Sequence, residues 1–361
     1  MTTPGRPAAP PLPAAVRAPL VPAGGPPALG GRDLREVLRL SWRPYRFALP
    51  QPLQTARDRI AERRGWLLRL QDPDGGVGWG EAVAWTAQEA SLHRALAALE
   101  PQQQRGRLER RLAGLPAPLA FALGAALAEL DGWLGERGEA WRPAPASAWL
   151  LPAGEAALAA VAALLAEAPG TPPPSLPPTF KWKVAAGEDG QERRLLERLL
   201  ELLPGSARLR LDANGGWGRS TAAAWADRLA ADPRLDWLEQ PLAPDDRPGL
   251  EALAARLPVA LDESLREHPE WCQGWHGWQV RRPSLEGDPR PLLAALRAGT
   301  PRLMLSTAFE TGIGRRWLAH LAALQLDGPT PAAPGLAPGW RPAGDLFSAD
   351  PERVWAAAAA P

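Results

Sequence analysis

Residues 179–214 read TFKWKVAAGEDGQERRLLERLLELLPGSARLRLDAN, and this stretch decides the fold that we expect. Two short apolar runs, Thr179–Val184 and Arg208–Ala213, flank an amphipathic segment, Glu192–Leu203. Short apolar runs bounded by turn residues are typical of buried strands, and a 3.6-residue apolar period is typical of helices. The stretch therefore predicts one βαβ unit of a parallel sheet.

The same alternation continues on both sides of this unit. Further apolar runs lie at 148–151, 235–241, 259–264, 278–284 and 303–307, with an eighth expected near 331–336. Amphipathic stretches separate the runs at 154–167, 220–231, 250–257 and 291–298. This number of repeats favours an α/β fold with a (β/α)7β-type barrel, a modified TIM barrel. An open doubly wound sheet is the alternative, but no glycine-rich phosphate loop supports it.

The N-terminal part of the chain has a different character. Residues 1–32 are rich in Pro, Ala and Gly without hydrophobic periodicity, which predicts a disordered tail rather than a packed extended arm. Strands are expected between Arg39 and Ala82, with a hairpin around Asp72–Gly76, and helices are expected at 86–99 and 118–134. We therefore predict four regions: the tail at 1–32, an α+β domain at 33–142, the barrel at 143–330, and a C-terminal segment at 331–361 that packs back on the α+β domain.

Charge and cysteine content exclude several classes of partner. The chain has 41 Lys and Arg against 40 Asp and Glu, a net charge of +1, so we expect neither a nucleic acid nor a membrane surface as partner. A single cysteine, Cys272, excludes an internal disulfide and fits a reducing compartment. No secretory signal pattern begins the chain, and the apolar stretches are too short to span a bilayer, so we expect a cytoplasmic protein.

Lysine is almost absent from this arginine-rich chain. The only lysines are Lys181 and Lys183, and the only asparagine is Asn214. Arginine replaces a solvated surface lysine at little cost, but it cannot replace a lysine that must give up its proton. An ordinary lysine has a pKa of about 10.4. A second lysine and a divalent metal nearby would lower that value, so we expect one lysine to act as a neutral base.

Polar side chains stand at the C-terminal ends of consecutive predicted strands: Lys181 with Lys183, then Asp212, Glu239, Asp262 and Arg282. Successive positions are 20 to 29 residues apart, which is one strand–helix repeat each. The C-terminal ends of barrel strands converge on one face, where active sites are found. A single acidic residue at a strand end is more often a helix cap, but the succession over five strands predicts a shared site.

The three carboxylates predict a metal site. They would repel one another unless a cation lay between them. A ligand set of oxygen atoms alone favours Mg²⁺ or Mn²⁺. Asn214 follows Asp212 by two residues and lies on the same side of the strand, where it can support the metal ligand or contact a substrate.

Six motifs resemble, in order, those of the enolase superfamily in its muconate-lactonizing subgroup, and most closely those of its o-succinylbenzoate synthase family. The motifs are FKWK (180–183), RLDAN (210–214), WLEQP (237–241), LDESL (261–265), RPSLEG (282–287) and STAFETG (306–312). The likeness extends from about Arg39 to Trp340, so the α+β region resembles the capping domain of that family.

The resemblance implies a lyase with a small-molecule carboxylate substrate. In that family 2-succinyl-6-hydroxy-2,4-cyclohexadiene-1-carboxylate loses water and gives o-succinylbenzoate, on the route to menaquinone or phylloquinone. It further implies that Lys183 removes the α-proton with help from Lys181. The implied ligands of Mg²⁺, for which Mn²⁺ substitutes, are Asp212, Glu239 and Asp262. Ser306 and Thr307 would bind the succinyl side or a carboxylate.

One position departs from the family pattern. The family usually has lysine immediately before the Pro-Ser-Leu stretch, where this chain has Arg282 after Arg281. A guanidinium stays charged, so we expect an electrostatic or stacking role there instead of proton transfer. A racemase needs a base on each face of the α-carbon, so the lysine inventory favours elimination. An N-succinylamino acid racemase or epimerase and a non-catalytic ligand-binding paralogue remain as alternatives.

Overall fold

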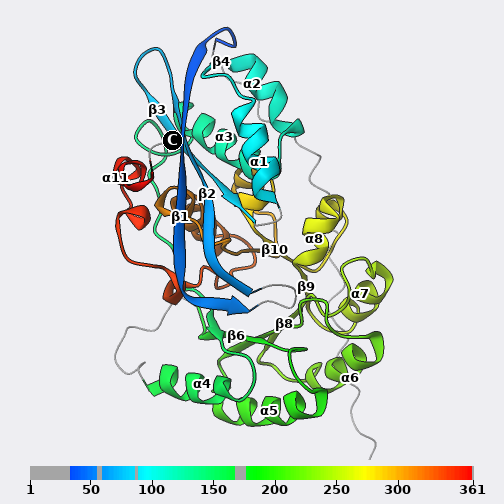
Figure 1. The fold of residues 1–361 in the computed structure, drawn as a ribbon. Coiled ribbons are helices and arrows are strands. Elements are labelled where there is room, and N and C mark those ends of the chain that lie inside the picture. The colour runs from blue at the N-terminus through cyan, green and yellow to red at the C-terminus, as the bar shows by residue number, and fades with distance from the viewer. Residues whose placement is uncertain (1–32, 55–58, 86–87, 167–175, 360–361) are drawn as a thin grey trace, which may run out of the picture.

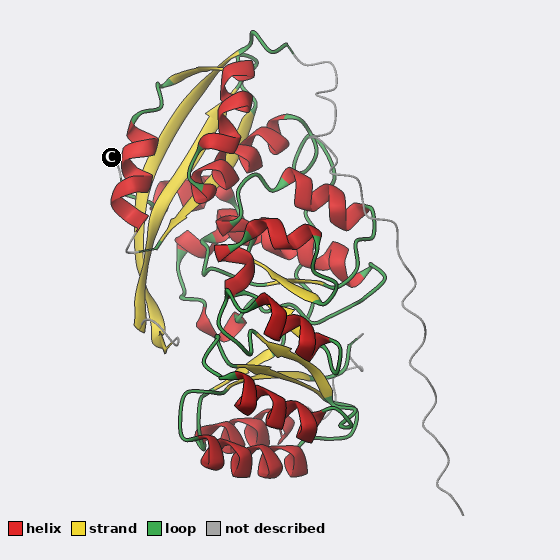
Figure 2. Ribbon diagram, turned by 90° about the vertical axis from the view of Figure 1, so that its right-hand side faces the viewer, coloured by secondary structure: helices red, strands yellow, loops and turns green. Residues whose placement is uncertain are grey.

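The structure is a computed structural model that describes residues 33–54, 59–85, 88–166 and 176–359. The predicted tail at 1–32 lies outside these ranges. The described chain forms two sheets, one antiparallel and one parallel, with helices packed on both (Figure 1 and Figure 2). Within these ranges no helix is both long and apolar enough to cross a membrane.

The antiparallel sheet has the strand order β3-β2-β1-β4. Its strands are β1 (Val37–Gln54), β2 (Arg59–Gln71), β3 (Val77–Ala84) and β4 (Gln102–Gln104). The predicted hairpin is present, because β2 and β3 pair antiparallel across a turn in which the Asp72 amide donates to the Gly76 carbonyl. The accompanying helices are α1 (Glu89–Ala97), α2 (Arg105–Arg111) and α3 (Ala117–Leu130).

Helix α3 packs directly on strand β3. Its sequence is apolar on all sides, and nearly the whole helix is buried. A Cβ added at Gly78 would lie 1.9 Å from the carbonyl oxygen of Ala126, and one added at Gly80 would lie 2.0 Å from that of Ala122. Glycine is required at both positions because the backbones of helix and strand approach so closely.

The parallel sheet has the order β11-β10-β9-β8-β7-β6-β5. Its strands are β5 (Trp149–Leu151), β6 (Thr179–Lys183), β7 (Arg208–Asp212), β8 (Leu235–Glu239), β9 (Val259–Leu261), β10 (Trp278–Arg281) and β11 (Leu303–Leu305). The helices that alternate with them are α4 (Ala156–Ala166), α5 (Asp189–Leu202), α6 (Arg219–Leu229), α7 (Arg247–Ala254), α8 (Glu263–Glu267), α9 (Arg290–Arg297) and α10 (Gly312–Leu326). Figure 1 shows α4 to α8 arranged along the outside of the strands.

A short segment joins the two edge strands of this sheet. Gly335 pairs in parallel with Ser306, and its amide donates to the Leu305 carbonyl at 2.8 Å. On the other side, the Ala148 amide donates to the Pro334 carbonyl at 2.9 Å. The segment lies where the eighth run was expected, and it closes the curled sheet. The structure therefore confirms the α/β barrel with an additional α+β region.

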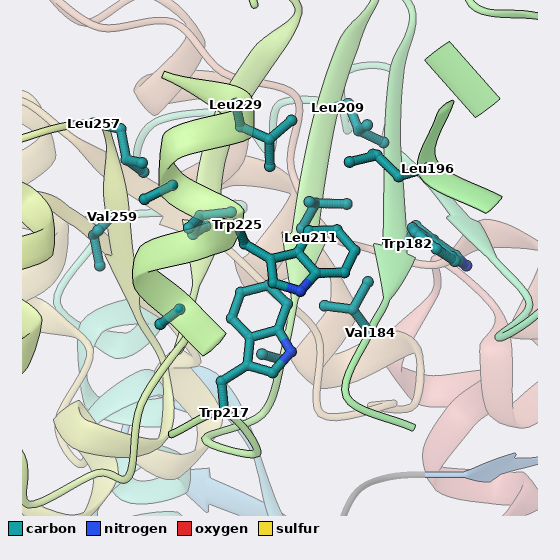
Figure 3. Close-up of a cluster of buried hydrophobic side chains, with 14 of the residues drawn as sticks. Trp182, Val184, Leu196, Leu209, Leu211, Trp217, Trp225, Leu229, Leu257 and Val259 are labelled. Carbon is teal, nitrogen blue, oxygen red and sulfur yellow. The ribbon is translucent and has the colours of Figure 1, made fainter. Parts of the chain in front are cut away.

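The main core of the barrel lies between the strands and the outer helices. Trp182 points outward from β6 and is 1% exposed, as the alternation Lys-Trp-Lys predicts. It belongs to a cluster with Leu196, Leu211 and the stacked pair Trp217 and Trp225, whose ring centroids are 4.9 Å apart (Figure 3). Burial of Trp182 on the outside of β6 orients its two neighbours, Lys181 and Lys183, toward the inside of the barrel.

The C-terminal residues pack against the antiparallel sheet. Phe347 meets Phe47 of β1 edge to face at 4.8 Å, and Trp355 of α11 (Pro351–Ala357) contacts Trp79 of β3. The exact domain bounds given above stay a prediction. Helices α10 and α11 were not predicted from the sequence, although α10 is mostly buried.

Candidate active site

A cavity of about 260 Å³ lies at the C-terminal ends of the parallel strands. It is lined by most of the residues singled out in the sequence: Lys181, Lys183, Asp212, Asn214, Asp262, Arg282, Ser306 and Thr307. Trp85, which follows β3, contributes to the wall from the antiparallel sheet. The cavity is therefore built from both sheets.

The two lysines meet the strand-end carboxylates. Lys181 Nζ lies 2.6 Å from Glu239 Oε1 and 2.9 Å from Asp212 Oδ2. Lys183 Nζ lies 3.2 Å from Asp212 Oδ2 and donates to Asn214 Oδ1 at 2.7 Å. Asn214 holds Lys183 at the cavity wall, so the only asparagine of the chain touches one of its only two lysines.

Strand register explains why these groups meet. Lys183 of β6 is the parallel partner of Asp212 on β7, and Asp212 is in turn the partner of Glu239 on β8. Glu239 pairs with Ala260, two residues before Asp262. Neighbouring strands lie about 4.8 Å apart, so residues in register bring their side chains into contact. The three carboxylate residues are almost fully buried, at 1%, 0% and 2% exposure.

The charges of these groups are strongly coupled. Burial lowers the pKa of Lys181, but attraction to Asp212 and Glu239 outweighs burial and raises it above the ordinary value. The sequence assigned the role of neutral base to one of the two lysines, and Lys181, which contacts two carboxylates, is held in its charged form. A divalent cation bound to the same carboxylates would weaken this attraction.

Burial raises the pKa of Glu239 above its usual value. For Asp212, attraction to Lys181 and Lys183 outweighs burial and holds the pKa below its usual range. Glu239 Oε2 is a buried oxygen without a hydrogen-bond partner. A buried carboxylate oxygen costs free energy unless a donor or cation meets it. The unpartnered oxygen and the oxygen-only ligand set fit a hard divalent cation.

The carboxylates do not already stand as a ready-made ligand group. Among the described residues, no three His, Cys, Asp or Glu side chains converge closely enough to hold a metal. Lys181 contacts both Asp212 and Glu239, and Arg282 holds Asp262. Cation binding here therefore requires these ion pairs to open.

Of the two adjacent arginines, Arg282 is the one that faces the cavity. Its Nε donates to Asp262 Oδ1 at 3.0 Å and its Nη2 to Oδ2 at 2.6 Å, which is a bidentate pair. A third bond runs from Nη1 to the Thr307 carbonyl at 2.6 Å. Arg281 instead pairs with Glu286.

Ser306 and Thr307 have different surroundings. The Thr307 hydroxyl donates to Glu310 Oε2 at 2.5 Å, so it is engaged within the protein. The Ser306 hydroxyl makes only a long contact of 3.4 Å with the Gly335 carbonyl. Ser306 is therefore the better placed of the two to donate to a substrate.

Two charged residues beside the three candidate metal ligands, Glu263 and Arg266, were not predicted from the sequence. Glu263 accepts from Asn214 Nδ2 at 3.2 Å and pairs with Arg266 at 3.3 Å. Burial and the neighbouring Asp262 raise the pKa of Glu263 to about 7. The signal in the sequence was the tandem Asp262-Glu263, with Arg266 one turn later on the same helix face.

The wall formed by the antiparallel sheet was not predicted either. Arg63 of β2 places its guanidinium carbon 4.6 Å from the centre of the Trp85 ring, and it is 2% exposed. Nothing in the local sequence of β2 indicates this contact with Trp85, which itself lines the cavity.

Comparison with known proteins identifies the family of this chain. Residues 158–273 match the model of the family described as Enolase C-terminal domain-like. Over 300 residues the chain is 37% identical to o-succinylbenzoate synthase of Thermosynechococcus vestitus, which covers 79% of this chain and 88% of the relative. It is 30% identical to o-succinylbenzoate synthase of Edwardsiella ictaluri, over 80% of this chain and 87% of the relative. The chain belongs to the o-succinylbenzoate synthase family of the enolase superfamily.

Two solved structures share the overall fold of this chain. An o-succinylbenzoate synthase from Thermosynechococcus elongatus, solved with Mg in its active site, superposes with a TM-score of 0.72 at 32% identity. It covers 88% of this chain and 99% of its own. The L-Ala-D/L-Glu epimerase of Bacillus subtilis superposes with a TM-score of 0.63 at 21% identity, over 82% of this chain and 89% of its own, which shows a common fold.

Proposed function

We propose that this chain is an o-succinylbenzoate synthase. The reaction is the loss of water from 2-succinyl-6-hydroxy-2,4-cyclohexadiene-1-carboxylate, which gives o-succinylbenzoate on the route to menaquinone or phylloquinone. The observation that carries the proposal is the contact of both lysines with strand-end carboxylates in one cavity, in a chain 37% identical to a protein of that name.

Lys183 is the proposed base. Its amine is held by Asn214 Oδ1 at 2.7 Å on the cavity wall, which orients it toward a bound substrate. It removes the proton next to the ring carboxylate, and the resulting ammonium then protonates the departing hydroxyl on the same face. One residue acting first as base and then as acid is sufficient for a syn elimination.

Asp212, Glu239 and Asp262 are the proposed ligands of Mg²⁺, and we expect Mn²⁺ to substitute because it accepts the same oxygen ligands. When bound, the cation supplies positive charge where the substrate carboxylate gains negative charge. The unpartnered, buried Glu239 Oε2 supports this assignment.

Lys181 and Arg282 are proposed to act as fixed positive charges. Lys181 assists beside Lys183, while Arg282 is positioned through Asp262 and the Thr307 carbonyl. Asn214 orients the base, and Ser306 donates to the substrate. Thr307 is proposed to contribute its backbone and its place in the cavity wall, because its hydroxyl is engaged by Glu310. Arginine does not lose its proton at working pH, so Arg282 is a poor second base and elimination is favoured over racemisation.

A direct assay tests the proposal. The purified chain is incubated with the cyclohexadiene substrate, and formation of the aromatic product is followed by absorbance, with added Mg²⁺ and after exhaustive chelation. We expect turnover only with the metal, and its return when Mg²⁺ or Mn²⁺ is restored. Absence of product from folded, Mg²⁺-loaded protein would contradict the assignment, and full turnover after chelation would contradict the metal.

A further inference from the structure

Two residues of the cavity wall, Glu263 and Arg266, have no part in the function proposed above. Both belong to α8, which begins directly after the proposed metal ligand Asp262. Both line the cavity, and Glu263 is only 7% exposed. Burial of a carboxyl group costs free energy unless its oxygens accept hydrogen bonds, so the partners of Glu263 indicate what it does.

Glu263 is connected to the proposed base through one side chain, Asn214. Glu263 Oε1 accepts from Asn214 Nδ2 at 3.2 Å. Asn214 Oδ1 accepts in turn from Lys183 Nζ at 2.7 Å. The two ends of a single amide group therefore join the carboxyl group of α8 to the amine of β6.

The backbone of Asn214 is fixed, but the torsion of its amide group is not. Its backbone N–H donates to Asp212 Oδ1 at 3.1 Å, and its φ of 45° lies in the left-handed region, which asparagine tolerates. The last torsion of an asparagine side chain has only a broad preference, so a half-turn that exchanges Oδ1 and Nδ2 costs little by itself. Hydrogen-bond partners therefore decide which of the two atoms faces Lys183.

Lys183 selects the orientation of this amide only while it carries its charge. An ammonium group has three donors and no acceptor, so it requires the oxygen of Asn214. A neutral amine, which is the form that removes a proton, has a lone pair that can accept from the Asn214 NH₂ group instead. That contact would occupy the lone pair on which proton abstraction depends.

Glu263 favours one of the two orientations whatever the charge of Lys183. Its Oε1 lies 3.3 Å from Nη2 of Arg266, a group that only donates, so this oxygen is kept as an acceptor. An acceptor at this place binds the Asn214 NH₂ group and leaves the amide oxygen for Lys183. Glu263 Oε2 has no hydrogen-bond partner in the part of the chain that the structure describes, so Oε1 makes these contacts by itself.

We propose that Glu263 is a positioning residue, which orients the Asn214 amide so that its oxygen faces Lys183 when that amine is neutral. This inference rests on the proposed function, in which Lys183 is the base. The amine then donates one N–H to Asn214 Oδ1, and its lone pair stays free for the substrate proton. Glu263 itself acts without contacting the substrate.

The test compares three substitutions. Glu263→Met removes the acceptor at nearly the same size. Glu263→Gln removes the negative charge but keeps one oxygen, which Arg266 and the Asn214 NH₂ group both select. Asn214→Ala removes the amide through which Glu263 acts, and it is combined with Glu263→Met in a double-mutant cycle. The control is Glu251→Met, an exposed glutamate on α7.

The Mg²⁺ affinity is measured by calorimetry on every folded variant, together with kcat and KM for the substrate. We expect Glu263→Met to lower kcat by about tenfold, the effect of one lost hydrogen bond, with KM and the Kd of Mg²⁺ within about threefold. Glu263→Gln should lower kcat by less than about threefold. In the Asn214→Ala background, Glu263→Met should change kcat by less than about twofold, because the amide that Glu263 orients is absent.

Four results would overturn the proposal. One is an unchanged kcat in Glu263→Met, and another is full additivity in the cycle, since Glu263 would then act without Asn214. The third is a Mg²⁺ affinity that falls as much as kcat, which would place Glu263 in the metal site. The fourth is a loss in Glu263→Gln as large as in Glu263→Met, which would make the negative charge decisive.

Glu263→Ala takes the place of Glu263→Met in the same cycle if the latter does not fold, and the same four criteria apply to it. Failure of the proposed function has a different signature, because the wild-type protein itself would then not convert the substrate.

Discussion

At the residue scale, the candidate site depends on a few side chains that no common substitute replaces. Lys183 contacts Asp212 and Asn214, and Lys181 bridges Asp212 and Glu239. Arginine at either lysine position would keep the positive charge but would not release a proton at neutral pH. Position 282 has a different requirement, since the role proposed for Arg282 beside Asp262 is that of a fixed positive charge.

The first prediction follows from this difference between positions 183 and 282. Lys183→Ala should lower kcat by about 10²–10⁴-fold, the range for loss of a general base. Arg282→Lys should retain activity within about tenfold, because a lysine keeps the charge beside Asp262. Steady-state kinetics on both variants checks this, together with exchange of the substrate α-proton in D₂O. Continued fast exchange in Lys183→Ala would assign the base elsewhere.

The second prediction concerns Glu239, whose Oε2 has no partner. Glu239→Gln removes a negative charge from the proposed metal site and weakens the contact to Lys181. We expect Mg²⁺ to bind at least about tenfold more weakly by calorimetry, with most activity lost. The control is Glu197→Gln on α5, which leaves the site untouched. Equal Mg²⁺ affinity in both variants would remove Glu239 from the ligand set.

At the scale of single elements, close packing of α3 on β3 holds the antiparallel sheet in the place where Trp85 reaches the cavity. The contact works because β3 presents glycine where α3 presents alanine carbonyls. Outward residues of β6 do the equivalent for the barrel, since burial of Trp182 orients both lysines inward. A side chain in the site is thus positioned by residues on the opposite face of its own strand.

The third prediction tests the α3–β3 contact with a matched pair of glycines. Gly78→Ala should lower the free energy of unfolding by about 1–3 kcal/mol or more, because the new Cβ would lie 1.9 Å from the Ala126 carbonyl oxygen. Gly114→Ala adds a Cβ that meets nothing within 4 Å, so it should be neutral or slightly stabilising. Urea unfolding of both variants gives the comparison. An equal effect of the two would show that α3 moves without cost.

At the scale of the whole molecule, the start of α10 connects the two sheets. Glu81 of β3 is fully buried and accepts hydrogen bonds from the amides of Thr311 and Gly314 and from the Thr311 hydroxyl. One turn later, Arg316 pairs with Glu129 of α3 at 2.5 Å. These contacts hold the start of α10 against β3 and α3.

The fourth prediction is the pH dependence of the free energy of unfolding that arises at the contact between α3 and α10. Burial raises the pKa of Glu129 from 4.5 to about 7, although the nearby Arg316 opposes it. Between these pH values the folded state holds a proton that the unfolded state has lost, so stability decreases as pH rises from about 4.5 to about 7. The effect is about 3 kcal/mol at most, at about 1.4 kcal/mol per pKa unit.

Urea titrations of the wild-type protein and of Glu129→Gln at pH 5 and pH 7.5 measure the effect. Between pH 5 and pH 7.5 the free energy of unfolding should fall less in Glu129→Gln than in the wild-type protein. The remainder is expected from Glu263, whose pKa is also raised. An identical decrease in both proteins would mean that Glu129 is ionised throughout, held so by Arg316.

The amino-acid sequence by itself determined the barrel, the two lysines and the strand-end carboxylates. Each of these depends on a local period: alternation along a strand, and one strand–helix repeat between successive strand ends. The scarcity of lysine singles out Lys181 and Lys183, and the order of the six motifs indicates the family to which the similar proteins belong.

Only the tertiary structure decided how the charges pair and what surrounds them. It selected Arg282 over Arg281, engaged the Thr307 hydroxyl with Glu310, and brought Trp85 to the cavity from a distant part of the chain. The physical reason is that these contacts join residues far apart in the sequence. Local periodicity predicts which face of an element a side chain is on, whereas the packing of sheets and helices sets which charge it meets.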